Sequence, residues 1–148
     1  MTTLLVALLA LLAPRQHVTV AASAGSTSAK AGGKVVLYVD VVPDAGIHVY
    51  APGATDYQSI TLTLEPSASV VAGKVVYPKS ETLFFEPLKE TVPIYQKPFR
   101  LAEDVTIAKS TKPGTKLKIA GKIDYQACDD KVCFIPASLP VSWTIDVK

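Results

Sequence analysis

Two cysteines are the residues in this sequence whose type and spacing could do chemistry. Cys128 and Cys133 are the only cysteines among the 148 residues, and four residues separate them. Residues that face each other across a tight antiparallel hairpin have Cα atoms about 4.5–5.5 Å apart, which is compatible with a disulfide. The sequence therefore predicts a disulfide that closes a short hairpin, as expected of a protein in an oxidising compartment.

The shortness of this loop bears on the purpose of the bond. Closing a loop of about six residues removes only about 2 kcal/mol of unfolded-state entropy, whereas a loop of about 100 residues would remove nearly 5 kcal/mol. Asp129 and Asp130 disfavour a thiolate on Cys128, and Lys131 favours it, so the local charges do not decide its reactivity. Spacing alone leaves a redox-active disulfide and a structural one equally open.

The sequence has too few suitable residues for a metal site, a phosphate-binding loop or a serine nucleophile. A zinc site needs four ligands, and the cysteines are joined only by His48, since His17 falls in the expected leader. A copper site needs two histidines and usually a methionine, and no His or Met follows Cys128. Phosphate-binding glycine loops and GxSxG turns are absent from the sequence. We expect no metal, no cofactor and no small-molecule ligand.

The sequence predicts that the elements that position the cysteines are β-strands. Residues 116–125 alternate apolar and charged side chains and lead directly into Cys128, and residues 141–147 alternate with Trp143 on the apolar face as a core anchor. Turn signals recur roughly every 8–12 residues, and no helical period persists. The pattern predicts one all-β domain of the β-sandwich kind, with further strands at 34–42, 47–50, 59–64 and 70–77.

A charged connection at residues 78–98 interrupts this pattern. It contains two adjacent aromatic residues, Phe84 and Phe85, flanked by Glu and Lys. One interpretation is a loop with a buried aromatic plug, and the other is a lid over a reactive site.

The N-terminal residues differ in composition from the rest. An unbroken apolar run from Leu4 to Ala13 has the length of a signal-peptide core and about half the length of a membrane-spanning helix. Small residues at 22–24 predict cleavage after Ala24. We therefore expect a leader or short hydrophobic anchor at 1–24, a linker at 25–33 and the domain at 34–148, with a frayed N-terminus as the alternative. The net charge of +2, with lysines spaced singly, indicates no nucleic-acid partner.

A family resemblance is carried by the run Tyr125-Gln126-Ala127-Cys128, followed by Cys133 and Pro136. It resembles the N-terminal periplasmic domain of the bacterial thiol:disulfide interchange protein DsbD, also known as the disulfide-bond corrector domain. Weaker similarity lies at 46–50, 76–78 and Tyr95, so that the resemblance covers about 34–148. The cysteine spacing is one residue shorter than in the best-known members.

The resemblance implies an immunoglobulin-like antiparallel β-sandwich with a redox disulfide near one end. In that family the domain takes electrons from a thioredoxin-like domain fed by a membrane thiol transporter and passes them to periplasmic disulfide oxidoreductases. The resemblance implies that Cys133 engages partners and Cys128 resolves the mixed disulfide. A phenylalanine-bearing cap shields the disulfide in the family, which makes Phe84 or Phe85 the candidate cap.

Four further residues are candidates for the surroundings of the disulfide. Tyr125 and Gln126 would flank it, and His48 and Tyr50 would line it. The alternative for the tyrosines is packing, and for Gln126 and His48 it is a solvated polar role. Because the sequence ends at Lys148, we expect donor and client to be separate proteins.

A rival hypothesis comes from another class of protein. The chain would then be a non-enzymatic, exported interaction module whose disulfide only rigidifies a binding hairpin. Either protein would be periplasmic or secreted.

Overall fold

The structure is a computed structural model that describes residues 15–86 and 89–148. Within these residues all regular elements are strands, and no helix is long and apolar enough to cross a membrane. The strands are β1 (Val18–Ala24), β2 (Ser28–Ala29), β3 (Lys34–Pro43), β4 (His48–Tyr50), β5 (Thr61–Leu64), β6 (Val70–Val76), β7 (Glu81–Phe85), β8 (Glu90–Tyr95), β9 (Phe99–Ile107), β10 (Lys116–Tyr125), β11 (Ala127–Cys128) and β12 (Ala137–Val147).

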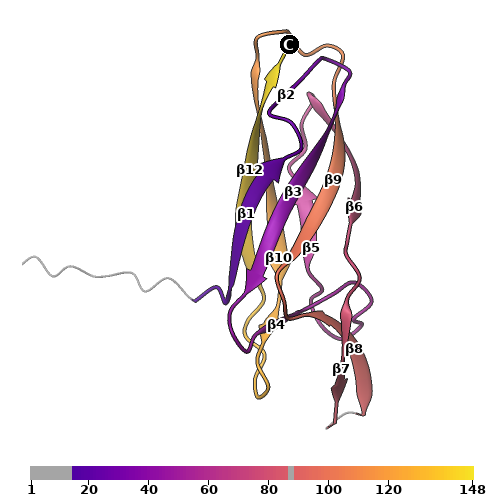
Figure 1. Cartoon of the computed structure of the whole chain (residues 1–148), viewed down its shortest axis with the longest axis vertical. Coiled ribbons are helices and arrows are strands. Elements are labelled where there is room, and N and C mark those ends of the chain that lie inside the picture. Colours follow the sequence, from indigo (N-terminus) through magenta and orange to yellow (C-terminus); the bar gives the residue numbers. More distant parts are fainter. Residues whose placement is uncertain (1–14, 87–88) are drawn as a thin grey trace, which may run out of the picture.

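The strands form three four-stranded sheets. Two of them, β1-β3-β9-β6 and β2-β12-β10-β5, pack face to face as an elongated sandwich (Figure 1). The third sheet, β11-β4-β8-β7, lies at the end of the sandwich opposite the C-terminus, and the β7–β8 hairpin projects from that end (Figure 1). The pairs are antiparallel except for the short parallel pair β2–β12. The expected immunoglobulin-like antiparallel β-sandwich is confirmed.

Alternating side chains fill the space between the two large sheets. Strands β10 and β12 pair along ten residues, which brings Ile119 opposite Trp143 on the buried face. The Trp143 side chain is 4% exposed, and its indole N–H donates a hydrogen bond to the Tyr38 carbonyl at 3.1 Å. Burial of the ring with its one polar group paired is the arrangement that stabilises a core tryptophan. The prediction that Trp143 anchors the core is confirmed.

Regular structure also occupies the region that was expected to be an irregular connection. Residues 81–85 and 90–95 form the antiparallel β7–β8 hairpin, in which Thr82 lies opposite Pro93. The expectation of a loop is therefore wrong. The sequence lacks a clear strand pattern here, because the hairpin contains a proline and charged residues, projects from the end of the sandwich, and leaves most of β7 exposed.

The N-terminal boundary of the fold also differs from the expectation. Strand β1 pairs with β3 at seven positions, from Val18 opposite Pro43 to Ala24 opposite Leu37, and Val18 is buried. In the expected linker, β2 pairs with β12, and the Gly33 carbonyl accepts a hydrogen bond from Ile107. The Ser, Ala and Gly residues of this segment are tolerated because β1 and β2 lie at the edges of their sheets. The same composition is typical of a linker, which explains the expectation. The apolar run at 4–13 lies outside the described residues.

Candidate functional site

A disulfide joins Cys128 to Cys133 at the end of the sandwich that carries the third sheet. The two Cα atoms are 4.0 Å apart, and the residues face each other as an antiparallel bridge. Cys128 is the last residue of β11, which pairs with β4, so the disulfide is attached to the sheet on one side only. The predicted hairpin disulfide is present.

Asp129 builds the tight turn between the cysteines. Its backbone N–H donates to the Val132 carbonyl at 2.9 Å, and its Oδ1 accepts hydrogen bonds from the N–H groups of Lys131 and Val132 at 2.8 and 2.7 Å. These hydrogen bonds from the Val132 and Lys131 amides hold the pKa of the Asp129 carboxyl below its usual value. Sequence reasoning treated Asp129 only as a charge, although Asp at the start of a turn is a known signal for this bonding.

The two cysteines differ sharply in exposure. Cys128 is 1% exposed and packs in a small cluster with Tyr50, Val92 and Ile94, whereas Cys133 is exposed on the far side of the turn. A thiolate that approaches from outside therefore meets Cys133 before Cys128. Attack at Cys133 would release Cys128 as the leaving thiolate.

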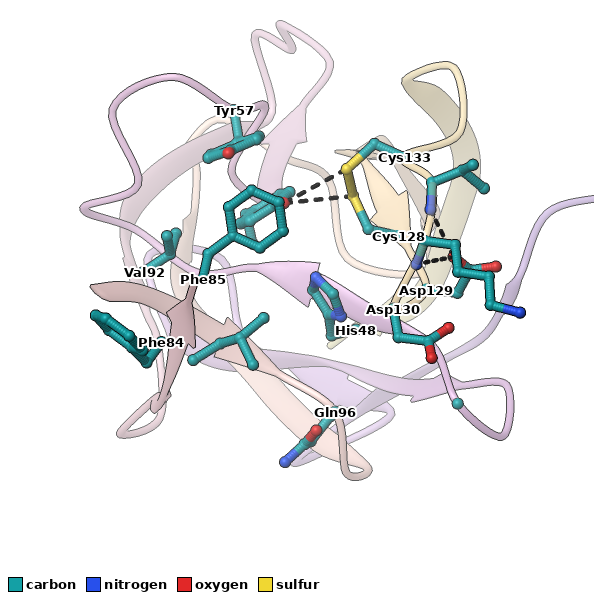
Figure 2. A pocket seen from close by; sticks show the side chains of 15 residues that line it. His48, Tyr57, Phe84, Phe85, Val92, Gln96, Cys128, Asp129, Asp130 and Cys133 are labelled. Atoms are coloured by element: carbon teal, nitrogen blue, oxygen red, sulfur yellow. Dashed lines mark hydrogen bonds between the residues drawn. A yellow bond between two sulfur atoms is a disulfide. The ribbon is translucent and has the colours of Figure 1, made fainter. Parts of the chain in front are cut away.

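The hydroxyl of Tyr50 contacts both sulfur atoms. It lies 3.4 Å from the Cys128 Sγ and 3.5 Å from the Cys133 Sγ, and it donates because the sulfurs of a disulfide carry no proton (Figure 2). The Tyr50 ring is 5% exposed and stacks on Tyr57 with centroids 4.1 Å apart. Burial, together with the nearby Tyr57 and Glu90, raises the pKa of Tyr50 to about 12. The hydroxyl therefore keeps its proton at physiological pH.

His48 lies directly opposite Cys128 in the β4–β11 pair. Its side chain is 9% exposed and meets the Tyr50 ring edge to face, with centroids 5.5 Å apart. Burial lowers the pKa of His48, and the negative charge of Asp129 opposes that effect. The structure thus places His48 and Tyr50 beside the disulfide.

A cavity of about 430 Å³ opens beside the disulfide. Its lining includes both cysteines, His48, Tyr50 and the two hairpin aromatics Phe84 and Phe85. Phe85 is 36% exposed and extends toward the part of the cavity that holds the disulfide, whereas Phe84 is 54% exposed and extends away from it (Figure 2). The adjacent aromatics therefore belong to the same site but face it differently.

Tyr125 and Gln126 lie at the base of the hairpin and do not line this cavity. Tyr125 is 1% exposed in the main core, where its hydroxyl donates to the Gln16 carbonyl. The Gln126 side-chain amide donates to the Phe134 carbonyl at 3.2 Å and accepts from the Gln58 N–H at 3.3 Å. Both residues therefore stabilise the base of the hairpin and lie outside the cavity lining.

Two aromatic contacts were missed from the sequence, one in the site and one outside its cavity. Tyr57 stacks on Tyr50 and donates a hydrogen bond to Glu90 Oε1 at 3.2 Å, which ties the loop after β4 to the β7–β8 hairpin. His17 stacks on Phe134, with ring centroids 3.8 Å apart. No local pattern marks either contact, and His17 had been assigned to the leader. Among the described residues, no group of three or more His, Cys, Asp or Glu could hold a metal ion.

The fold and the site together define a class of protein: a β-sandwich domain with a short-loop, partly accessible disulfide at one end. The family described as "Thiol:disulfide interchange protein DsbD, N-terminal" matches residues 12–142, and the chain belongs to this family. None of the curated proteins matches the chain in sequence.

Two solved structures have similar folds. The N-terminal periplasmic domain of ScsB from Proteus mirabilis superposes with a TM-score of 0.62 and 15% identity, over 90% of this chain and 49% of that one. The DsbD N-terminal domain of Neisseria meningitidis, in its reduced form, gives a TM-score of 0.54 and 17% identity, over 92% of this chain and 91% of that one. The chain thus spans about half the length of the ScsB structure, and at these identities the likeness establishes the fold.

Proposed function

We propose that this domain is an exported thiol:disulfide interchange domain that relays electrons through the Cys128–Cys133 disulfide. The donor would be a thioredoxin-like domain or a membrane thiol transporter, and the acceptors would be periplasmic disulfide oxidoreductases. The observation that carries the proposal is the pairing of an exposed residue, Cys133, with a buried one, Cys128, while one tyrosine hydroxyl lies within 3.5 Å of both sulfur atoms. The ScsB structure is that of a periplasmic domain, which supports export to the periplasm.

The domain is reduced in the first half of the cycle. A donor thiolate attacks the Sγ of Cys133, a bond forms between donor and Cys133, and the bond to Cys128 breaks with its electron pair on Cys128. The hydroxyl of Tyr50 is placed to donate a hydrogen bond to that new thiolate. The second thiolate of the donor then attacks the donor's own sulfur in the mixed disulfide. The donor leaves oxidised, and the domain holds two more electrons.

The second half of the cycle reduces the client. The Cys133 thiolate attacks the client disulfide and forms a mixed disulfide, and one client thiolate leaves. Cys128 then attacks the Sγ of Cys133, the Cys128–Cys133 bond forms again, and the second client thiolate leaves. Two electrons have moved from the domain to the client.

The experiment that tests this proposal is a measurement of the reduction potential. The purified chain is equilibrated in graded thiol buffers, and free thiols are trapped and counted by mass spectrometry. We expect a value of roughly −180 to −270 mV, the range of exchange proteins. A value below about −300 mV, the range of structural disulfides, would leave the interaction module as the better hypothesis.

A double variant with both cysteines replaced by serine is the matched control. We expect this variant to keep the fold, as judged by circular dichroism, and to lose all electron transfer to a disulfide substrate. Retained transfer in this variant would contradict the proposal.

A further inference from the structure

His48 is a buried titratable group beside the disulfide that the exchange steps above do not use. It is the cross-strand partner of Cys128, and side chains of directly opposite residues share one face of the sheet, with Cβ atoms about 4.5–5.5 Å apart. Both residues line the same cavity, and Figure 2 shows the imidazole on the wall that also carries Cys128. The ring therefore lies on the same face of the sheet as the Cys128 side chain and lines the cavity with it.

The client step requires a base at this position. Cys128 attacks the mixed disulfide as a thiolate, because the thiol form is a poor nucleophile. Its side chain is 1% exposed, so bulk water has little access to the thiol proton. Burial also raises the pKa of a thiol, which makes spontaneous ionisation rarer. The proton must pass to a group that lines the cavity.

The other titratable groups of the cavity lining are poorly suited to accept this proton. The hydroxyls of Tyr50 and Tyr57 keep their own protons, because burial raises the pKa of both groups. Asp129 Oδ1 already accepts two backbone hydrogen bonds, and these hold the pKa of its carboxyl low. Asp130 and Lys131 are exposed on the turn, and Lys131 is itself a cation.

His48 has the properties that the step requires. Burial lowers the pKa of His48, so the imidazole is neutral near neutral pH and has a lone pair to accept a proton. The negative charge of Asp129 favours the imidazolium that forms after transfer. The edge-to-face contact with Tyr50 holds the ring plane in place.

We infer that His48 accepts the proton of the Cys128 thiol when Cys128 resolves the mixed disulfide on Cys133. This inference rests on the proposed function. The S–H bond of Cys128 breaks and its proton goes to the imidazole. The thiolate pair then forms the bond to the Sγ of Cys133, and the bond from Cys133 to the client breaks with its pair on the client thiolate. The imidazolium returns its proton to solvent.

A two-phase kinetic experiment tests this role. The reduced chain is mixed with one equivalent of dithiobis(nitrobenzoate), and release of the coloured thiolate is followed by stopped flow. The first release reports attack by Cys133, and the second reports resolution by Cys128. We expect His48→Gln to leave the first phase unchanged and to slow the second by about 100-fold at neutral pH, the lower end of what general-base catalysis contributes.

The pH profile separates a proton acceptor from a merely structural residue. In the wild type, the second-phase rate levels off once His48 is neutral, whereas in His48→Gln it rises with pH until the Cys128 thiol itself ionises. His17→Gln is the matched control, since His17 is the only other histidine and does not line the cavity. This variant keeps both phases and the wild-type profile.

Two results would overturn the inference. One is a second phase in His48→Gln with the wild-type rate and pH profile. The other is an unchanged His48 pKa between the oxidised and reduced wild type, measured by NMR of the ring, which does not depend on the variant folding. Absence of the first phase in the wild type would instead remove the proposed function, because it reports Cys133 alone.

Discussion

The hydroxyl of Tyr50 contacts both sulfur atoms of the disulfide. It can therefore donate a hydrogen bond to the thiolate that forms when the disulfide is reduced. The Tyr50 hydroxyl is 3.4 Å from one sulfur and 3.5 Å from the other, so whichever cysteine leaves as a thiolate already has a donor beside it. A hydrogen bond to a charged group is worth about 1.5–3 kcal/mol. That energy corresponds to a fall of about one to two units in the pKa of a thiol.

Replacing Tyr50 with Phe removes this donor and keeps the ring that stacks on Tyr57. We expect the pKa of the Cys133 thiol in the reduced domain to rise by about one unit, and its alkylation near neutral pH to slow about ten-fold. The measurement is the rate of iodoacetamide alkylation against pH, with the product located by mass spectrometry. An unchanged thiol pKa would show that the hydroxyl does not stabilise the thiolate.

At this scale the sequence predicted the bond, but not the contact of the Tyr50 hydroxyl with both sulfur atoms. The two cysteines are the only ones in the chain and are close together, so their pairing needed no tertiary information. Tyr50 reaches Cys128 across 78 residues, and only the pairing of β4 with β11 brings the two together. The weak family similarity at residues 46–50 made Tyr50 a candidate. No pattern in the neighbouring sequence indicates that its hydroxyl contacts a sulfur atom.

Among the elements, the β7–β8 hairpin carries the two phenylalanines that line the cavity beside the disulfide. It lies at the edge of the third sheet, and its tyrosine contact, Tyr57 to Glu90, ties it to the loop after β4. Successive side chains on a strand point to opposite faces, so only one of the adjacent phenylalanines can face the sulfurs. Phe85 extends toward them and Phe84 does not (Figure 2).

Replacing Phe85 with Ala opens the cavity above the disulfide. We expect dithiothreitol to reduce the Cys128–Cys133 bond several-fold faster in Phe85→Ala than in the wild type, because a small thiol then reaches Cys133 with less obstruction. The rate is measured by quenching with acid and counting thiols. Phe84→Ala is the matched control and keeps the wild-type rate. Equal rates in the two variants would mean that the hairpin is not a cap.

The sequence placed these aromatics near the site but not on a strand. The strand at residues 116–125 was predicted with its observed bounds because its alternation is complete. The β7–β8 hairpin has no such alternation, and its apolar residues Val92 and Ile94 are buried, with Leu83 packed against them, in a small cluster with Tyr50 and Cys128. Its position therefore depends on tertiary packing.

For the molecule as a whole, the core contains one carboxylate whose protonation bears on stability. Glu103 lies between Leu101 and Val105 on the inward face of β9 and is 4% exposed. Its Oε2 has no hydrogen-bond partner among the described residues. Burial raises the pKa of the Glu103 carboxyl, so the folded state holds this proton more tightly than the unfolded chain does.

Taken alone, Glu103 should therefore lower the free energy of unfolding as pH rises. The contribution of Glu103 is complete below the usual glutamate pKa of about 4.3 and is lost as pH rises through the raised pKa of the folded state. Glu103→Gln removes this titration, and we expect it to be more stable than the wild type at pH 7 by on the order of 1 kcal/mol. Urea denaturation at a series of pH values measures both effects.

Asp104→Asn supplies the control for that series, because it removes an exposed carboxylate from the same strand. If the curve of Glu103→Gln stays parallel to that of the wild type, Glu103 does not titrate differently in the folded and unfolded states. The sequence could predict that residue 103 faces inward, but not that its Oε2 lacks a hydrogen-bond partner among the described residues.

Strand β1 is the edge strand that covers β3. It covers β3 along seven residues, and β3 is an apolar strand with Val35, Leu37, Val39 and Val41 buried. A form of the protein that begins after Ala24 would lack β1 and would present a long row of unpaired N–H and C=O groups on β3. Such an edge is a template for pairing with another chain. The position of the first residue would then decide whether copies of the domain remain separate or polymerise.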